Sequence, residues 1–274
     1  MKPIIKYQGG KGKELPFIQT ILPKTYSKVV EPFCGGAAVS FGLETVAHLN
    51  DINRDVINLY RVIGSPVLYP DVQSWIDQYK LLEHDDLEKL YYKSREIINQ
   101  PWSNTTDLDS RAIAYIIVRQ LCFSGMERYN SKGEFNVPFG HYKKLSCNLS
   151  LQHHKFLHKC DNIDHGSFEK VFDGLTENDF VFVDPPYLDR LGYTAGDGGL
   201  KLHQDLLGCL QTTSAKWMVV HCDNEFYRDA YADYNVITKD FKYSQNFVGR
   251  DNSGNKVSHL YITNYDVSPL DTLL

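Results

Sequence analysis

The residue types best suited to chemistry in this sequence stand together in the tetrapeptide Asp184-Pro185-Pro186-Tyr187. Asp184 supplies a carboxylate that accepts hydrogen bonds, and Tyr187 supplies a flat aromatic face. Because proline has no backbone N–H and Pro186 favours an extended Pro185, carbonyl groups here point outward with no local donor. A carboxylate, a carbonyl and a ring together suit a planar ligand that carries an exocyclic amine. The plainer alternative is a turn that ends a strand, with Asp184 as its cap.

Two glycine pairs near the N-terminus indicate a second ligand. Glu31-Pro32-Phe33-Cys34-Gly35-Gly36 overlaps the end of a predicted strand at residues 27–33, and glycines at such a turn let the backbone approach a ligand closely. Asp51 ends the next predicted strand, at residues 47–50, where a carboxylate suits the two hydroxyls of a ribose. The turn departs from G-x-G-x-x-G, so a pyrophosphate dinucleotide is less suitable.

The second glycine pair, in Tyr7-Gln8-Gly9-Gly10-Lys11, stands beside a cation, which suits a ligand with a carboxylate. Each of these features has an ordinary alternative: glycine pairs make turns, Lys11 could be a solvated surface charge, and Asp51 could cap a helix. Their occurrence together, in this order and followed by residues 184–187, favours a cofactor site.

Hydrophobic periodicity predicts the elements that must position these residues. The apolar run at residues 180–183 reads as a buried strand, which places the tetrapeptide at a strand's carboxyl end, where open α/β sheets bind ligands. Gly35 and Gly36 should open a helix that reaches residue 44. Asn53 should cap a helix that reaches residue 61.

Beyond residue 65 the pattern changes. Residues 65–120 read as helices, with an amphipathic helix at 81–99 and an apolar one at 109–121. Strand patterns resume later, at residues 180–184, 216–221, 235–238 and 257–263, and the last two could form the antiparallel end of a mixed sheet. We therefore expect an α/β fold in which residues 1–54 and 150–274 form one domain and residues 55–149 are inserted. The glycine-rich residues 192–199 suggest a mobile lid.

The segment from residue 119 to residue 144 combines basic and aromatic side chains, which suits a nucleic acid. Its basic residues are Arg119, Arg128, Lys132, Lys143 and Lys144, against the acidic Glu127 and Glu134. Its aromatic residues are Phe123, Tyr129, Phe135, Phe139 and Tyr142. Asn130-Ser131-Lys132-Gly133 is a hairpin-turn signal, and a basic hairpin can enter a major groove. The alternative is a structural hairpin whose aromatic residues belong to the core.

Composition narrows the class of protein. The 274 residues carry a net charge of −5, so affinity for a nucleic acid would have to be local. The six cysteines form no C-x-x-C pair, which argues against a zinc site and a disulfide scaffold and fits a reducing cytoplasm. We find no membrane-length apolar run and no secretory pattern, and we expect no metal.

Taken together, these motifs resemble the Dam-type, alpha-group DNA adenine methyltransferases. The resemblance spans about residues 4–265 and includes the order of the motifs. It rests on residues 7–11, residues 31–36, Asp51, the tetrapeptide, and the most specific match, Arg128-Tyr129-Asn130, Gly133 to Gly140 and Tyr142-Lys143-Lys144. It implies a Rossmann-like methyltransferase sheet with an inserted, helical and β-hairpin target-recognition domain.

The resemblance also implies the ligands. S-adenosylmethionine would be the methyl donor and S-adenosylhomocysteine the product. Tyr7 and Lys11 would lie at the methionine end, Phe33 and Phe168 near the adenine, and Asp51 on the ribose. Gly9, Gly10, Glu31, Gly35, Gly36 and Asp184 complete the implied cofactor site. The catalytic residues would be those of the tetrapeptide, acting on the amine of a flipped-out adenine.

The implied partner is double-stranded DNA, with GATC as the family's usual target and no obligate protein partner. Lys6, Met126, Arg128, Pro138 and Tyr142 would read bases, with Arg128 on a guanine edge, and Asn130 and Lys143 would add contacts. This sequence departs from the bacterial pattern at Phe123-Ser124, where Tyr-Asn is usual, and at His141, which replaces a phosphate-contacting arginine. Such departures suit a phage or prophage origin, with the enzyme acting in a bacterial cytoplasm.

Three rival functions remain open at this point. The chain could be an amino-methylase of cytosine, although those enzymes more often carry serine at the position of Asp184. It could methylate adenine in RNA, although the Dam-like hairpin favours duplex DNA. It could also be a non-catalytic DNA-binding module, against which the intact Lys11, Asp184 and Tyr187 argue.

Overall fold

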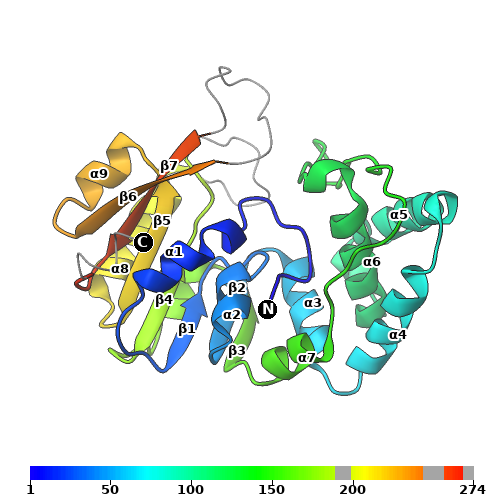
Figure 1. Cartoon of the computed structure of the whole chain (residues 1–274), viewed down its shortest axis with the longest axis horizontal. Coiled ribbons are helices and arrows are strands. Elements are labelled where there is room, and N and C mark those ends of the chain that lie inside the picture. The colour runs from blue at the N-terminus through cyan, green and yellow to red at the C-terminus, as the bar shows by residue number, and fades with distance from the viewer. Residues whose placement is uncertain (189–198, 243–255, 268–274) are drawn as a thin grey trace.

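The protein is built on a seven-stranded mixed sheet with the strand order β3-β2-β1-β4-β5-β7-β6 (Figure 1). The computed structural model describes residues 1–188, 199–242 and 256–267. The strands are β1 (Lys28–Glu31), β2 (Ala47–Asp51), β3 (Asn162–His165), β4 (Asp179–Val183), β5 (Lys216–Cys222), β6 (Asn235–Lys242) and β7 (Lys256–Thr263). All neighbouring strands run parallel except β7, which is antiparallel to both β5 and β6. The predicted Rossmann-like α/β fold is confirmed.

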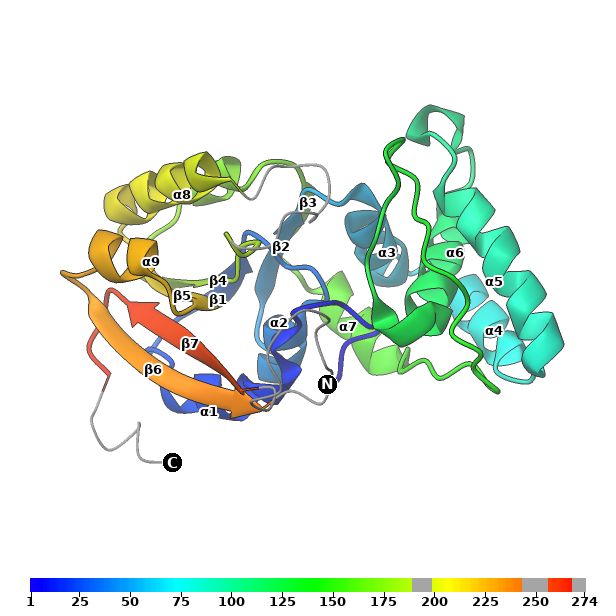
Figure 2. The same cartoon turned by 90° about the horizontal axis from the view of Figure 1, so that it is seen from above.

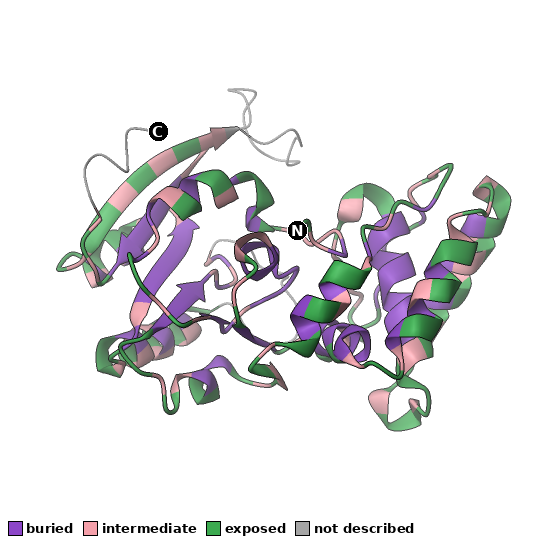
Figure 3. Cartoon of the chain, turned by 60° about the horizontal axis from the view of Figure 1, so that its bottom comes forward, coloured by how far each residue is buried: buried purple, intermediate pink, exposed green. Residues whose placement is uncertain are grey.

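Helices cover both faces of this sheet because its strands are apolar on both sides (Figure 2). Val29 and Phe180 face α1 (Leu15–Thr20) and α2 (Ala38–Leu43), while Val30 and Val181 face α8 (Leu200–Thr212) and α9 (Glu225–Ala230). The central strands are correspondingly buried along their length, as Figure 3 shows. A continuous apolar run was therefore the right signal for β4 and β5.

A second group of helices lies beside the β3 edge of the sheet and forms the other lobe in Figure 1. These helices are α3 (Arg54–Gly64), α4 (Tyr69–Tyr79), α5 (His84–Ile98), α6 (Leu108–Leu121) and α7 (Leu151–His158). One apolar core runs without a break from Leu49 in β2 through Leu59 in α3 to Ile116 in α6. The two lobes are therefore fastened together by α3, whose predicted cap, Asn53, accepts hydrogen bonds from the N–H groups of Asp55 and Val56.

Several predicted boundaries shift in the structure. Residues 35 and 36 form a hydrogen-bonded turn rather than the first turn of a helix, because Gly35 and Ala37 both have positive φ, and α2 starts only at Ala38. The predicted hairpin contains no extended strand within the described residues, only single bridges between Tyr129 and Phe135 and between Cys122 and Phe139. Most of the suggested lid at residues 192–199 falls outside the described residues.

Across residues 1–188, 199–242 and 256–267, no helix combines the length and apolar character needed to cross a bilayer.

Candidate active site

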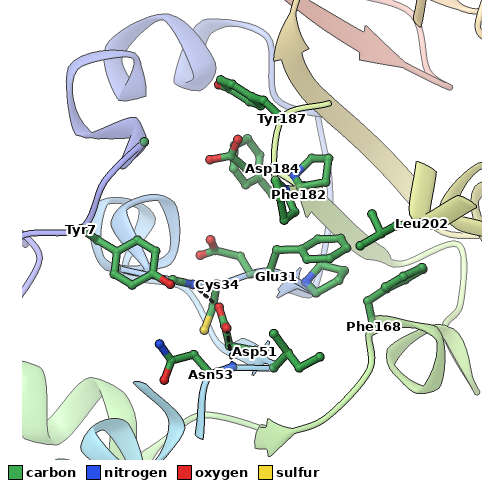
Figure 4. Close-up of a pocket in the computed structure, with 18 of the residues that line it drawn as sticks. Tyr7, Glu31, Cys34, Asp51, Asn53, Phe168, Phe182, Asp184, Tyr187 and Leu202 are labelled. Carbon is green, nitrogen blue, oxygen red and sulfur yellow. Dashed lines mark hydrogen bonds between the residues drawn. The ribbon is translucent and has the colours of Figure 1, made fainter. Parts of the chain in front are cut away.

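The carboxyl ends of β1, β2 and β4 meet at one cavity of about 620 Å³, at the point where the strand order changes direction (Figure 4). Such switch points are where open α/β sheets bind ligands. Every residue predicted to be catalytic or cofactor-binding lines this cavity: Tyr7, Gly9, Gly10, Lys11, Glu31, Phe33, Gly35, Gly36, Asp51, Phe168, Asp184, Pro185, Pro186 and Tyr187. The structure thus brings together segments separated by more than a hundred residues.

Lys11 is the electrostatic centre of the catalytic half of the cavity. Its buried ammonium group donates to Asp184 Oδ2 at 2.5 Å, to the Gly9 carbonyl at 3.0 Å and to the Tyr187 hydroxyl at 3.1 Å. Burial raises the pKa of Asp184, and the ammonium of Lys11 opposes that rise. Lys11 therefore favours the charged carboxylate in a site where desolvation favours the neutral form.

His221 supports the tetrapeptide from behind, and the sequence offered no motif that singles it out. Its ring lies 4.7 Å from the ring of Tyr187, and its Nε2 accepts the backbone N–H of Leu188 at 3.3 Å. Its Nδ1–H donates to the Cys222 carbonyl at 2.8 Å, which assigns the tautomer. Burial lowers the pKa of His221 to about 3, so the ring stays neutral and its Nε2 remains an acceptor.

Asp51 anchors the other half of the cavity. Its carboxylate accepts the backbone N–H of Gly35 and that of Asn53, each at 2.8 Å. Burial raises the pKa of Asp51 to about 6. A side chain at Gly35 would meet the Tyr7 ring at 2.6 Å, and its φ of +44° suits glycine. The glycine turn was predicted to admit a ligand, and in the structure it also admits Tyr7.

Glu31 lies between these two halves and faces the cavity (Figure 4). It is buried at the end of β1 and accepts the backbone N–H of Ser40 at 2.8 Å. Burial raises its pKa from 4.5 to about 7. Beside it, the rings of Phe33 and Phe168 lie 5.1 Å apart and form an aromatic wall. A buried acid, an aromatic wall and a second carboxylate suit a ligand with a cationic group, a planar ring and a diol.

We expect Glu31→Gln to stabilise the ligand-free protein above pH 7. Because the folded chain keeps a proton on Glu31 between about pH 4.5 and pH 7 that the unfolded chain has lost, the stability from this group falls as pH rises through that window. Glutamine keeps an acceptor for Ser40 and removes the charge, so the gain at pH 8 should approach about 2–3 kcal/mol.

Urea unfolding at pH 5 and pH 8 measures this difference. The exposed Glu177→Gln serves as the matched control and should follow the parent protein at both values. A Glu31→Gln variant that is no more stable than the parent at pH 8 would show that the charge on Glu31 does not destabilise the folded protein.

Except for Lys6, which lies near the N-terminus, the residues predicted to contact DNA lie on the segment between α6 and α7, and all of them are at least partly exposed. Phe123, Ser124, Met126, Arg128, Pro138, His141 and Lys143 are exposed, and Lys6, Asn130 and Tyr142 are half-buried. The side chains of Tyr91 and Asn99 hold this segment against α5 through hydrogen bonds to Val137 and Phe135 (Figure 2).

Some of the basic and aromatic residues counted in this segment are structural. Arg119 is buried, donates to the carbonyls of Lys6 and Met126, and lies 3.6 Å from Glu127, so it adds no charge to the surface. Phe135 and Phe139 belong to the apolar core. The basic, aromatic face is therefore smaller than the sequence suggested, because a buried ion pair and core rings cannot be told from surface ones by type.

Other residues that line the cavity were not predicted as site residues. Phe182, Asn53 and Leu202 line it as well, and Leu202 comes from α8, which was not predicted. Its amphipathic pattern after the glycine-rich residues could have revealed it. In the described part of the chain, no cluster of three or more histidine, cysteine, aspartate or glutamate side chains is arranged to hold a metal ion.

Comparisons with known proteins agree with this geometry. The family described as D12 class N6 adenine-specific DNA methyltransferase matches residues 7–245. The Type II methyltransferase M.CviBI of Paramecium bursaria Chlorella virus NC1A is 32% identical over 278 residues, which cover 97% of this chain and 100% of the relative. The Type II methyltransferase M.MjaIII of Methanocaldococcus jannaschii is 35% identical over 201 residues, 68% of this chain and 69% of the relative.

A third relative is named as a DNA adenine methylase and not as a Type II methyltransferase. The DNA adenine methylase of Haemophilus influenzae is 28% identical over 246 residues, 84% of this chain and 82% of the relative. The predicted family and the predicted kind of enzyme are confirmed. This chain belongs to the D12 class of N6 adenine-specific DNA methyltransferases, enzymes that use S-adenosylmethionine to methylate adenine in DNA.

Proposed function

We propose that the enzyme methylates an adenine turned out of the duplex, held by Asp184, Pro185, Pro186 and Tyr187. Extrusion of a stacked base costs a few kcal/mol, which contacts in the pocket must offset. The observation that carries this proposal is the placement of Asp184 and the Tyr187 ring in one cavity with the cofactor-binding residues. A base still inside the helix could not reach that cavity.

Each residue of the tetrapeptide has a separate task in this proposal. Tyr187 stacks on the adenine ring, and the carboxylate of Asp184 and the carbonyl of Pro185 accept hydrogen bonds from its amine. These acceptors aim the nitrogen lone pair at the methyl donor, so the reaction depends on positioning and needs no covalent enzyme intermediate. S-adenosylmethionine, when bound, supplies a methyl group on a sulfonium centre.

The residues around the cavity suit this cofactor. Glu31 is a buried acid with a raised pKa. The ammonium group of a methionine moiety would neutralise the charge of its carboxylate. Asp51 would accept hydrogen bonds from the ribose, and Phe33 and Phe168 would flank the adenine. Lys11 would hold the methionine carboxylate, with Tyr7 beside it. The chemistry requires no metal in this assignment.

For DNA recognition we propose that residues 55–149 form the target-recognition domain and that GATC is the target. Arg128 is exposed, and its guanidinium donates to the side chain and the carbonyl of Asn136, which aligns it along the edge of the segment. Lys6 lies 3.9 Å above the Tyr142 ring and donates to the Gln120 carbonyl at 2.7 Å. We infer that both cations reach bases, with Met126 and Pro138 beside them.

Three further residues would act on the duplex itself. Phe123 is exposed at the start of a tight turn in which Ser124 has a φ of 53°, so its ring suits the space left by the extruded base. His141 and Lys143 would contact the backbone, and Asn130 shapes the turn by accepting two backbone N–H groups, those of Lys132 and Glu134.

We expect Arg128→Ala to relax sequence choice more than it weakens binding to unrelated DNA. A bidentate contact between arginine and guanine is worth about 1–3 kcal/mol of discrimination, because the wrong base leaves the donors without partners. Sequencing methylated adenines in a host that expresses each variant measures the site preference. The control is Lys132→Ala, which removes the same charge from the exposed turn without touching a proposed base reader. An unchanged methylome in Arg128→Ala would contradict the assignment.

Base extrusion has its own experiment. We expect a GATC duplex with 2-aminopurine at the target position to become more fluorescent when the enzyme and a cofactor analogue bind, because unstacking removes quenching. A duplex with 2-aminopurine outside the site serves as the control, and equal responses from the two would contradict extrusion. Type II methyltransferases and Dam enzymes both stand among the relatives, and we infer that this enzyme works in one of those settings, on DNA inside a bacterial or phage-infected cell.

A further inference from the structure

A buried chain of polar groups extends from the Tyr187 hydroxyl through His259 to Glu14. The Tyr187 hydroxyl lies 3.4 Å from His259 Nε2, and His259 Nδ1 lies 2.9 Å from Glu14 Oε2. The Tyr261 hydroxyl donates to the same oxygen of Glu14. Glu14, His259 and Tyr261 are buried, with exposed fractions of 1%, 3% and 0%. Neither Glu14 nor His259 belongs to the motifs that identify the family resemblance.

The chemistry of these groups favours one direction for the hydrogen bonds that join Lys11, Tyr187, His259 and Glu14. A lysine ammonium can only donate, so the Tyr187 oxygen accepts from Lys11 and its own proton is available to His259 Nε2. An Nε2 that accepts requires the proton on Nδ1, which then donates to Glu14. A carboxylate accepts from both His259 and Tyr261. In this arrangement each of these hydrogen bonds has one donor and one acceptor.

The hydrogen bonds from Lys11 and to His259 hold the Tyr187 hydroxyl from two elements of the fold. Glu14 follows Lys11 by three residues at the end of the same turn, and it forms the N-cap position of α1. His259 comes from β7, on the far side of β5. The phenol of Tyr187 is thereby held between Lys11 and His259, which restricts the angle of its ring and the position of the ammonium that contacts Asp184.

We propose that Glu14 and His259 form a positioning pair for methyl transfer: Glu14 fixes the Nδ1–H tautomer of His259, and His259 orients the Tyr187 hydroxyl and with it the stacking ring. This inference rests on the proposed role of Tyr187 as the residue that stacks on adenine. Neither Glu14 nor His259 touches the base. Their effect is on how often Tyr187 and Lys11 occupy the geometry that transfer requires.

The test compares Glu14→Gln, His259→Gln and Tyr187→Phe, which alter one link of the chain each and keep its approximate volume. Single-turnover methylation at saturating cofactor and DNA should fall about tenfold to a hundredfold in each, as expected for loss of one or two oriented hydrogen bonds. The dissociation constants for cofactor and DNA should stay within about threefold, because Glu14 and His259 do not line the cavity and Tyr187→Phe keeps the stacking ring. Combining Glu14→Gln with Tyr187→Phe should give no further loss, since both interrupt one pathway.

A matched control separates positioning from loss of stability. His153 is another buried histidine, bonded to Ser150 and to the Lys2 carbonyl far from the cavity. We expect His153→Gln to lower the thermal midpoint and to leave the single-turnover rate unchanged. Nitrogen NMR of labelled histidine gives a second readout: His259 should be the Nδ1–H tautomer in the parent protein and should lose that preference in Glu14→Gln.

The outcomes are distinguishable. Three results would each overturn the inference and leave the proposed function intact. The first is a double variant, Glu14→Gln with Tyr187→Phe, whose loss of rate is the product of the two single losses. The others are an unchanged rate in Glu14→Gln and an Nε2–H tautomer of His259 in the parent protein. If Glu14→Gln does not fold, His259→Gln combined with Tyr187→Phe decides by the same comparison, and the parent tautomer decides if neither folds. A Tyr187→Ala variant that retains full turnover would instead defeat the proposed function itself.

Discussion

Replacing Asp184 with alanine is expected to abolish methyl transfer while cofactor affinity changes by no more than about tenfold. The carboxylate is the acceptor that draws the adenine amine into line, and loss of one such oriented group typically costs about 10²–10³ in rate. Asp184 lies directly after β4, in the cavity and within 2.5 Å of Lys11, so its removal disturbs the chemistry more than the fold. Transfer of a tritiated methyl group and calorimetric titration of the cofactor measure the two effects separately.

Asp184→Asn is the matched variant for this experiment, because it keeps the size of the side chain and removes the charge. We expect it to be nearly as inactive as Asp184→Ala, since one side of an amide is a donor and would repel the amine hydrogens. Turnover retained in both variants would remove Asp184 from the mechanism.

Lys11→Met is expected to lower kcat/KM by about 10²–10³, because it removes the cation that favours the ionised form of Asp184. Burial already raises the pKa of Asp184, and the loss of Lys11 raises it further. Transfer needs the carboxylate form, so the acid limb of the pH profile should move to higher pH. The deficit should therefore be larger at pH 6 than at pH 9.

A pH–rate profile of the parent and the variant checks this direction. Lys13→Met removes the same charge from an exposed position in the same segment and should leave the profile in place. A Lys11→Met enzyme whose deficit is the same at every pH would mean that Lys11 acts only on the cofactor and does not govern Asp184.

The sequence predicted those parts of the fold in which local pattern and environment agree. The apolar run before Asp184 became β4 because both faces of a central parallel strand are covered by helices. The edge strand β3 was missed because its residues, Asn162–His165, are largely polar and pair with β2 alone. Its position depends on a neighbour more than a hundred residues away, which no local window contains.

The candidate site was predictable for a similar reason. Residues 7–11, residues 31–36 and residues 184–187 are short motifs whose types carry chemistry, and the switch point of the sheet brings them together. Glu14, His221 and His259 were missed because each is a single polar residue outside any recognisable motif, and their partners include residues distant in sequence. Arg119 shows the opposite error, since its charge was counted on the surface although Glu127 and backbone carbonyls surround it.

The central claim is that this cavity transfers a methyl group to the N6 amine of adenine in duplex DNA. The most direct measurement is to incubate the purified protein with duplex DNA and S-adenosylmethionine and to identify the methylated nucleoside by mass spectrometry. We predict N6-methyldeoxyadenosine, formed by the parent protein and absent with Asp184→Ala. N4-methyldeoxycytidine as the product, or equal N6-methyldeoxyadenosine from both proteins, would contradict the account.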